Sequence, residues 1–136
     1  MSTPATKPAF ESDQGPRRKV LLTKPYEIEG KGRVFVIPAT VHLDPEELPE
    51  TIEFVNQTGG PVTIWLPNGN HFLKPYKDPE TDKVHEFIQP IDVATKGELL
   101  VEVKERVPNG YYEYNVYCKV IGDYAQGHSS PVVCCP

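Results

Sequence analysis

The side chains with the most specific chemistry in this 136-residue chain are three cysteines and four histidines. Cys118 ends a run of aromatic and apolar residues at the start of a polar loop, and His128 lies further along that loop, in the turn sequence Gln-Gly-His-Ser-Ser-Pro. A thiol in this place is a small buried hydrophobe, a metal ligand, or a redox or nucleophilic group. His71 and His85 lie in a second polar stretch, where a histidine is either a ligand or an ordinary solvated residue.

The other two cysteines, Cys134 and Cys135, are adjacent, so a strand through them would turn their thiols to opposite faces. A metal clamp made of these thiolates would need a partner from elsewhere in the chain. His42 alternates with the apolar residues Val41 and Leu43, which predicts an exposed face for the imidazole.

The cysteine usage also bears on the compartment. An odd number of cysteines without paired spacing is not a disulfide framework and fits a reducing cytoplasm. The N-terminal residues contain no apolar run of the kind found in signal peptides. We therefore expect a cytoplasmic protein, or a periplasmic or secreted one if a precursor segment was removed.

The run that ends at Cys118 predicts a β-strand. The turn sequence Asn109-Gly110 begins it, and the aromatic and β-branched residues that follow favour an extended conformation. Because side chains alternate along a strand, Cys118 is expected to share the inward, apolar face. The predicted inward face consists of Tyr112, Tyr114, Val116, Cys118 and Val120, and the outward face of Glu113, Asn115, Tyr117 and Lys119.

Further short strands are predicted between proline- and glycine-containing turns, at residues 20–23, 33–37, 40–43, 51–56, 62–66, 99–107 and 131–133. In the strand at 51–56, Ile52 and Phe54 are expected to point inward and Glu53 outward. Two antiparallel sheets packed as a sandwich would bury this pattern. The predicted core contains Phe54, Ile64, Leu99, Val101, Tyr114, Val116 and Cys118.

Two segments do not follow the strand pattern. Residues 1–19 are rich in proline and polar side chains and are predicted to be a flexible arm, with a single domain at 20–136. The end of the arm, Arg17-Arg18-Lys19, is either a solvated linker or a contact for a phosphate or a partner. Residues 67–85 form a polar loop long enough to be functional or mobile. One helical turn is expected after Asp44, which is a suitable N-cap.

Several function classes are disfavoured. The net charge of −5 argues against a nucleic-acid partner. No apolar stretch approaches the roughly 20 residues that a membrane-spanning helix needs. The sequence contains no glycine-rich phosphate loop, no Gly-x-Ser-x-Gly and no His-Glu-x-x-His motif, so we expect no enzyme activity.

Three segments together resemble the cupredoxins, the β-sandwich family that includes the blue-copper proteins. The segment 51–61 is similar to the family's strand that ends in Asn and a proline turn, and 110–118 to its Gly-aromatic-x-x-Tyr-x-Cys strand. The third segment is the return strand that begins at Pro131. The resemblance covers about residues 33–135 and implies an all-β, antiparallel Greek-key sandwich.

The resemblance also implies a copper site made by a His, a Cys, a second His and usually a Met. Cys118 matches the thiolate, but Val62 stands at the position of the first His, and the only methionine is Met1. An altered ligand set would therefore be Cys118, His128 and His71, with Gln126 as a weak axial oxygen.

We thus expect a non-catalytic cupredoxin-like binding module that uses the loops at the Cys118 end and needs no cofactor. Its partner would be a protein or a small molecule, without nucleic acid or membrane. The alternative is a copper-binding electron-transfer or copper-carrier protein with the altered ligand set. A third hypothesis is an enzyme that acts through Cys118, which would need a His base.

Overall fold

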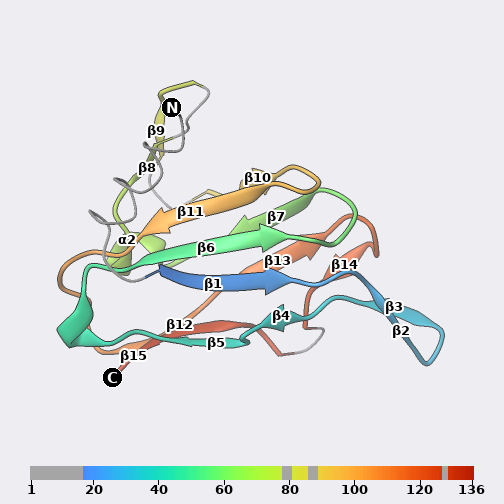
Figure 1. Ribbon diagram of the computed structural model, residues 1–136, viewed down its shortest axis with the longest axis horizontal. Coiled ribbons are helices and arrows are strands. Elements are labelled where there is room, and N and C mark those ends of the chain that lie inside the picture. Colours follow the sequence, from blue (N-terminus) through green and yellow to red (C-terminus); the bar gives the residue numbers. More distant parts are fainter. Residues whose placement is uncertain (1–16, 78–80, 86–88, 127–128) are drawn as a thin grey trace, which may run out of the picture.

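The computed structural model describes residues 17–77, 81–85, 89–126 and 129–136, without the side chains of Lys77 and His85. The described residues form a two-layered β-sandwich (Figure 1), so the predicted all-β class is confirmed. The first layer has the strand order β11 (Glu98–Glu102), β6 (Thr51–Asn56), β1 (Arg17–Leu22) and β4 (Val36–Ile37). The described part of the chain contains no helix with the length and hydrophobicity needed to cross a membrane.

The second layer consists of two strand groups that share one stretch of chain. One group is β12 (Gly110–Glu113), β15 (Val132–Cys135) and β5 (Thr40–His42), and the other is β10 (Ile91–Val93), β7 (Val62–Trp65), β13 (Asn115–Cys118) and β14 (Asp123–Tyr124). Only Tyr114 separates β12 from β13, so the 110–118 stretch joins the two groups. Most pairings are antiparallel, while β1 with β6 and β15 with β5 are parallel.

The predicted alternation along 110–118 is confirmed as far as Cys118. Tyr112, Tyr114, Val116 and Cys118 are all buried, and the Tyr114 ring meets Phe54 of β6 edge to face at 5.5 Å between ring centroids. Val120 was predicted to continue the inward face, but it is 47% exposed because the strand ends at Cys118 and a turn follows. The predicted core of seven residues is buried in one cluster.

The prediction of a polar loop at 67–85 is partly wrong, because the beginning of this segment belongs to the core. A single helical turn, α2 (Gly69–Phe72), buries Phe72 against the Tyr112 ring at 4.7 Å between centroids. Leu73 is also buried and forms a β-bridge with Val103. After α2 comes the hairpin β8 (Tyr76–Lys77) and β9 (Val84–His85).

Residues 17–19, which were predicted to be the end of the arm, belong to β1 and pair with residues 51–53 of β6. Arg18 is therefore not a solvated linker end: its guanidinium hydrogen-bonds to the carboxylate of Glu50, which is fully buried. Glu53 was expected to be exposed, but it is only 6% exposed and forms an ion pair with Arg17 at 3.5 Å. The remaining predicted arm, residues 1–16, lies outside the described residues.

The strand predicted at 33–37 is interrupted. Residues up to Arg33 form the hairpin β2 (Tyr26–Ile28) and β3 (Lys31–Arg33), and the chain then continues as β4 in the first layer. After β4, the chain passes Pro38 and enters the second layer as β5. The predicted helical turn is confirmed as a 3₁₀ turn, η2 (Pro45–Glu47), with the Asp44 side chain accepting a hydrogen bond from the Glu46 N–H at 3.0 Å.

Two buried tyrosines in the 110–118 stretch differ in their hydrogen bonding, and this difference predicts opposite effects of one substitution. The Tyr112 hydroxyl donates to the carbonyl of Pro108, whereas the Tyr114 hydroxyl has no partner among the described residues. Burial raises the pKa of Tyr114 above its usual value, because the tyrosinate would be poorly solvated.

We expect Tyr112→Phe to lower the free energy of unfolding by about 1 kcal/mol, the net value of one hydrogen bond. Tyr114→Phe removes a buried, unpaired hydroxyl, so it is expected to be neutral or to stabilise the chain by up to about 1 kcal/mol. Chemical denaturation of both variants measures the two effects. A loss of stability in Tyr114→Phe as large as in Tyr112→Phe would show that the Tyr114 hydroxyl has a partner.

Candidate functional site

Cys118, the thiol that the sequence singled out, is completely buried at the end of β13. Its partners across the sheet are Val62 of β7 and Asp123 of β14. Burial raises the pKa of Cys118 to about 11, a backbone hydrogen bond from Ala125 lowers it in part, and the charge of Asp123 raises it. The side chain is therefore a protonated thiol at neutral pH and packs as a small apolar group.

The turn before Val62 is held by its own polar side chains. The Asn56 amide donates to the carbonyls of Gly60 at 2.8 Å and Ala94 at 3.0 Å, and its oxygen accepts from the Thr58 N–H and hydroxyl. Both Asn56 and Thr58 are buried. The network thus fixes the course of the chain into Val62 and leaves the Asn56 amide with partners inside the protein.

The loop after Cys118 is equally well braced. It turns at Gly122, whose φ of +63° suits glycine, and returns as β14 beside β13. The Gln126 side-chain oxygen, considered above as an axial ligand, accepts a hydrogen bond from the Val36 N–H at 2.7 Å. Gln126 therefore ties this loop to β4 in the described structure.

The outward side of the same hairpin carries exposed apolar side chains. The rings of Tyr117 and Tyr124 pack edge to face at 5.2 Å between centroids and are 38% and 51% exposed. Val120 lies in the turn between them, where its side chain is close to Gly60. We call Tyr117, Val120 and Tyr124 the tyrosine surface. The sequence predicted the outward direction of Tyr117, but not the strand that contains Tyr124, because two residues are too few to show a strand pattern.

Of the two histidines predicted as copper ligands, His71 lies away from Cys118 in the described structure. Cys118 pairs with Val62 at the beginning of β7, whereas exposed His71 lies in α2, beyond the other end of that strand. His42 is exposed on β5, where it pairs with Cys134. His128 and the side chain of His85 lie outside the described residues.

The donor set at the Cys118 end does not fit a blue-copper centre as far as the structure describes it. Such a centre needs a thiolate and two imidazoles. Of the two residues paired with Cys118, Val62 has no donor atom and Asp123 has a carboxylate rather than an imidazole. The described residues contain no group of three or more His, Cys, Asp or Glu side chains that could hold a metal ion. Because His128 is not described, the altered ligand set stays a prediction.

The vicinal cysteines lie in β15, away from this end. Cys134 and Cys135 are both buried free thiols, so both faces of β15 are covered. The Cys135 thiol contacts the Val107 carbonyl at 3.8 Å, and burial is the main cause that raises the pKa of Cys135. Their positions favour packing over a metal clamp.

The sequence matches no protein-family model and no curated protein. Among solved structures, the chain is similar to a Cu-containing nitrite reductase (NirK) from Thermus scotoductus SA-01, with a TM-score of 0.52 and 11% identity over 89% of this chain and 31% of that chain. It is also similar to a blue copper oxidase from Nitrosomonas europaea, with a TM-score of 0.46 and 13% identity over 88% of this chain and 38% of that chain.

The chain thus spans about a third of the length of the structures it matches. At such low identity the likeness shows the fold alone. The chain has a cupredoxin-like, all-β fold, which confirms the fold class that the sequence predicted.

Because Cys118 is buried and its pKa is about 11, its alkylation is expected to be slow in the folded chain. Iodoacetamide labelling followed by peptide mass mapping should show slower modification of Cys118 than in the same chain in denaturant. The native rate should also rise with pH well above neutrality, since the thiolate fraction grows about tenfold per pH unit below the pKa. Equal rates at neutral pH in the folded and denatured chain would contradict the described burial.

Proposed function

We propose that this chain is a non-catalytic binding module whose protein partner contacts the tyrosine surface at the Cys118 end. The observation that carries the proposal is the pairing of two exposed tyrosines outside a thiol that is itself sealed inside the sheet. The outer side of this hairpin offers aromatic contact area, whereas its inner side offers no accessible reactive group.

The chemistry of the tyrosine surface suits a protein partner. Tyrosine is enriched at the centres of protein–protein interfaces, because its ring gives a large contact area and its hydroxyl tolerates water. Tyr117 and Tyr124 hold each other in an edge-to-face pair, so little side-chain freedom is lost on binding. Val120 adds an apolar contact at 47% exposure.

A non-catalytic role is favoured by the state of Cys118. A nucleophilic cysteine is normally accessible and has a lowered pKa, and Cys118 has the opposite properties. Of its two cross-strand partners, Val62 cannot act as a base and Asp123 disfavours the thiolate, because burial and the charge of Asp123 both raise the pKa of Cys118. Three buried free thiols also suit the reducing cytoplasm that we propose as the setting.

Photo-crosslinking tests the proposed surface. With p-benzoylphenylalanine in place of Tyr124 or of Tyr117, we expect irradiation of the source cells to link the chain to the same protein. The matched control is Tyr111, another exposed tyrosine, on β12 beside Cys134. Val120→Asp should abolish the crosslink by placing a charge within the apolar contact.

Crosslinking to the same protein from position 111 with equal yield, or none from 117 and 124, would contradict the proposed surface. The thermal stability of each variant must be measured alongside, so that loss of the fold is separated from loss of binding. All three tyrosine positions are on the exposed side of their strands, so large side chains are expected to be tolerated there.

The alternative function is copper binding for electron transfer or copper delivery. It is supported by the likeness to a nitrite reductase named as copper-containing and by Cys118 at the end of β13. Its proposed ligands are Cys118, His128 and His71. It would require the chain near Cys118 to rearrange, because Val62 occupies the cross-strand position and His71 lies beyond the far end of β7.

Titration of the reduced chain with Cu(II) separates these functions. We expect no intense blue thiolate-to-copper absorption, since a single buried thiol without paired imidazoles does not make such a centre. The spectrum of Cys118→Ala should be the same as that of the parent chain. A blue band that disappears in Cys118→Ala and in His128→Ala would promote the copper function over the binding module.

A further inference from the structure

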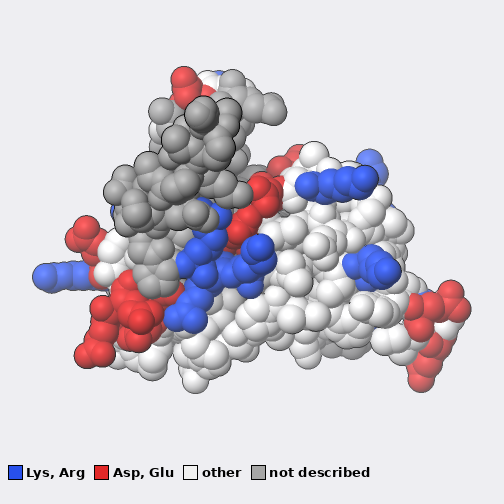
Figure 2. Space-filling model, viewed as in Figure 1, with Lys and Arg blue, Asp and Glu red and all other residues white. Residues whose placement is uncertain are grey.

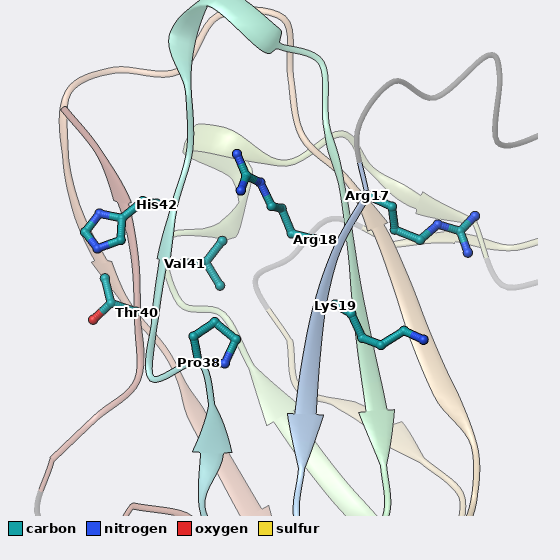
Figure 3. Close-up of a pocket in the computed structure, with 7 residues that line it drawn as sticks. All are labelled: Arg17, Arg18, Lys19, Pro38, Thr40, Val41 and His42. Atoms are coloured by element: carbon teal, nitrogen blue, oxygen red, sulfur yellow. The ribbon is translucent and has the colours of Figure 1, made fainter.

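A slot lies between β1 and β5 at the end of the sandwich opposite to Cys118. It arises where the chain passes from the first layer to the second at Pro38. Before that point, β4 pairs with Leu21 and Leu22 of β1, and after it, β5 pairs with β15 instead. Among the described strands, none covers residues 17–20 of β1 on the side away from β6. The resulting pocket has a volume of about 330 Å³ (Figure 3).

The edge of β1 presents backbone hydrogen-bonding groups to this slot. The Leu22 carbonyl accepts from Gln57 on the β6 side, whereas the Thr23 N–H donates to Phe35 on the other side. Because backbone groups alternate along a strand with a period of two residues, the N–H and C=O of Lys19 point the same way as those of Thr23. Lys19 therefore directs both groups into the slot, where no described strand pairs with them.

The edge of β5 is open in the same manner. The Leu43 N–H donates to Cys134 and the Ala39 carbonyl accepts from Val132, so the odd-numbered residues point toward β15. The N–H and C=O of Thr40 and His42 consequently point away from β15. Both residues line the slot (Figure 3), which thus lies between two strand edges.

The charged side chains around the slot do not converge on its centre. Figure 3 shows Arg17 and Lys19 pointing to the side away from β5, while Arg18 points along the slot toward the 3₁₀ turn. Arg18 is already engaged by buried Glu50, and Arg17 by Glu53. A small anion would therefore find its cations spread around it or already paired, whereas an extended backbone would find open edges on two sides.

We propose that the slot receives an extended peptide strand, which adds to the edge of β1 and lies beside β5. This mode of recognition, β-strand addition, draws its affinity from main-chain hydrogen bonds and its specificity from alternate side chains. The site differs from the tyrosine surface in place and in chemistry, and it goes beyond the function proposed above.

The surroundings of the slot define the side chains that the strand would carry. Lys19 forms no salt bridge among the described residues, so an acidic side chain is favoured beside it on the outward face of the added strand. Figure 2 shows Lys and Arg side chains gathered over the beginning of β1 on a chain whose net charge is −5. On the inward face, buried Val41 favours a small apolar side chain.

The test uses the full-length chain and a blocked hexapeptide of alternating glutamate and valine. We expect the peptide to bind and to slow hydrogen exchange at the Lys19 and His42 amides, which would gain partners. A hexapeptide of alternating lysine and valine should bind at least about tenfold more weakly than the glutamate–valine peptide, because its charges are reversed. The glutamate–valine peptide with methylated backbone nitrogens should not bind, since it cannot form the edge hydrogen bonds.

A substitution at Lys19 isolates the backbone contribution in the protein. The Lys19 N–H points away from β6, so Lys19→Pro removes the edge donor without removing a hydrogen bond of the sheet. We expect it to weaken peptide binding about tenfold or more. Lys19→Ala, the matched control, keeps the edge donor and should weaken binding less.

Equal affinity of Lys19→Pro and Lys19→Ala for the peptide would overturn strand addition. Equal affinity of the parent chain for the methylated and the unmethylated peptide would overturn it as well. Displacement of the peptide by inorganic phosphate would assign the slot to an anion instead. A dimer in sedimentation that Lys19→Pro dissociates would identify a second copy of this chain as the occupant. Peptide binding only after deletion of residues 1–16 would identify that segment as the occupant. Crosslinking at the tyrosine surface is unaffected by any of these results.

Discussion

The stretch 110–118 is the constraint on which the rest of the sandwich depends. It pairs with β15 through its first half and with β7 and β14 through its second half, so its second half has neighbours along both edges. Its inward side chains include Tyr114, which packs against Phe54 of the opposite layer. A strand placed in this way cannot move by one residue without exchanging its buried and exposed faces. The burial of Cys118 and the exposure of Tyr117 are thus two results of one register.

Alternation in the sequence predicted this central part well. Phe54, Val101 and Cys118 are buried where a period of two residues placed them, because each lies in a strand that packs one face onto the core. The pattern failed where a strand ends: it extended the inward face to Val120, although the turn begins at Cys118. Periodicity carries no signal for the last residue of a strand, since the turn hydrogen bonds that end it are not visible in the sequence.

Two other differences have a tertiary cause. Residues 17–19 are strongly basic and look like a solvated arm, yet β6 provides a parallel neighbour for them and the buried carboxylate of Glu50 receives Arg18. Phe72 lies in a mostly polar stretch of the sequence, but α2 turns its ring onto Tyr112. In both cases the partner is distant in the chain. The candidate site was therefore predictable for Cys118, which depends on local alternation, and not for the slot, which depends on where the chain changes layers.

The pairing of Cys118 with Val62 connects the fold to the choice between functions. A buried imidazole at position 62 would need hydrogen-bond partners or a metal to offset its desolvation, whereas valine needs neither. Val62 and Cys118 therefore form an apolar contact that stabilises the end of the sheet without a ligand. The same contact keeps the thiol away from solvent, so the recognition proposed at this end would use the outward side chains of the β13–β14 hairpin. At the opposite end, the chain changes layers and exposes backbone rather than side chains, so recognition there would depend on hydrogen bonds between strands.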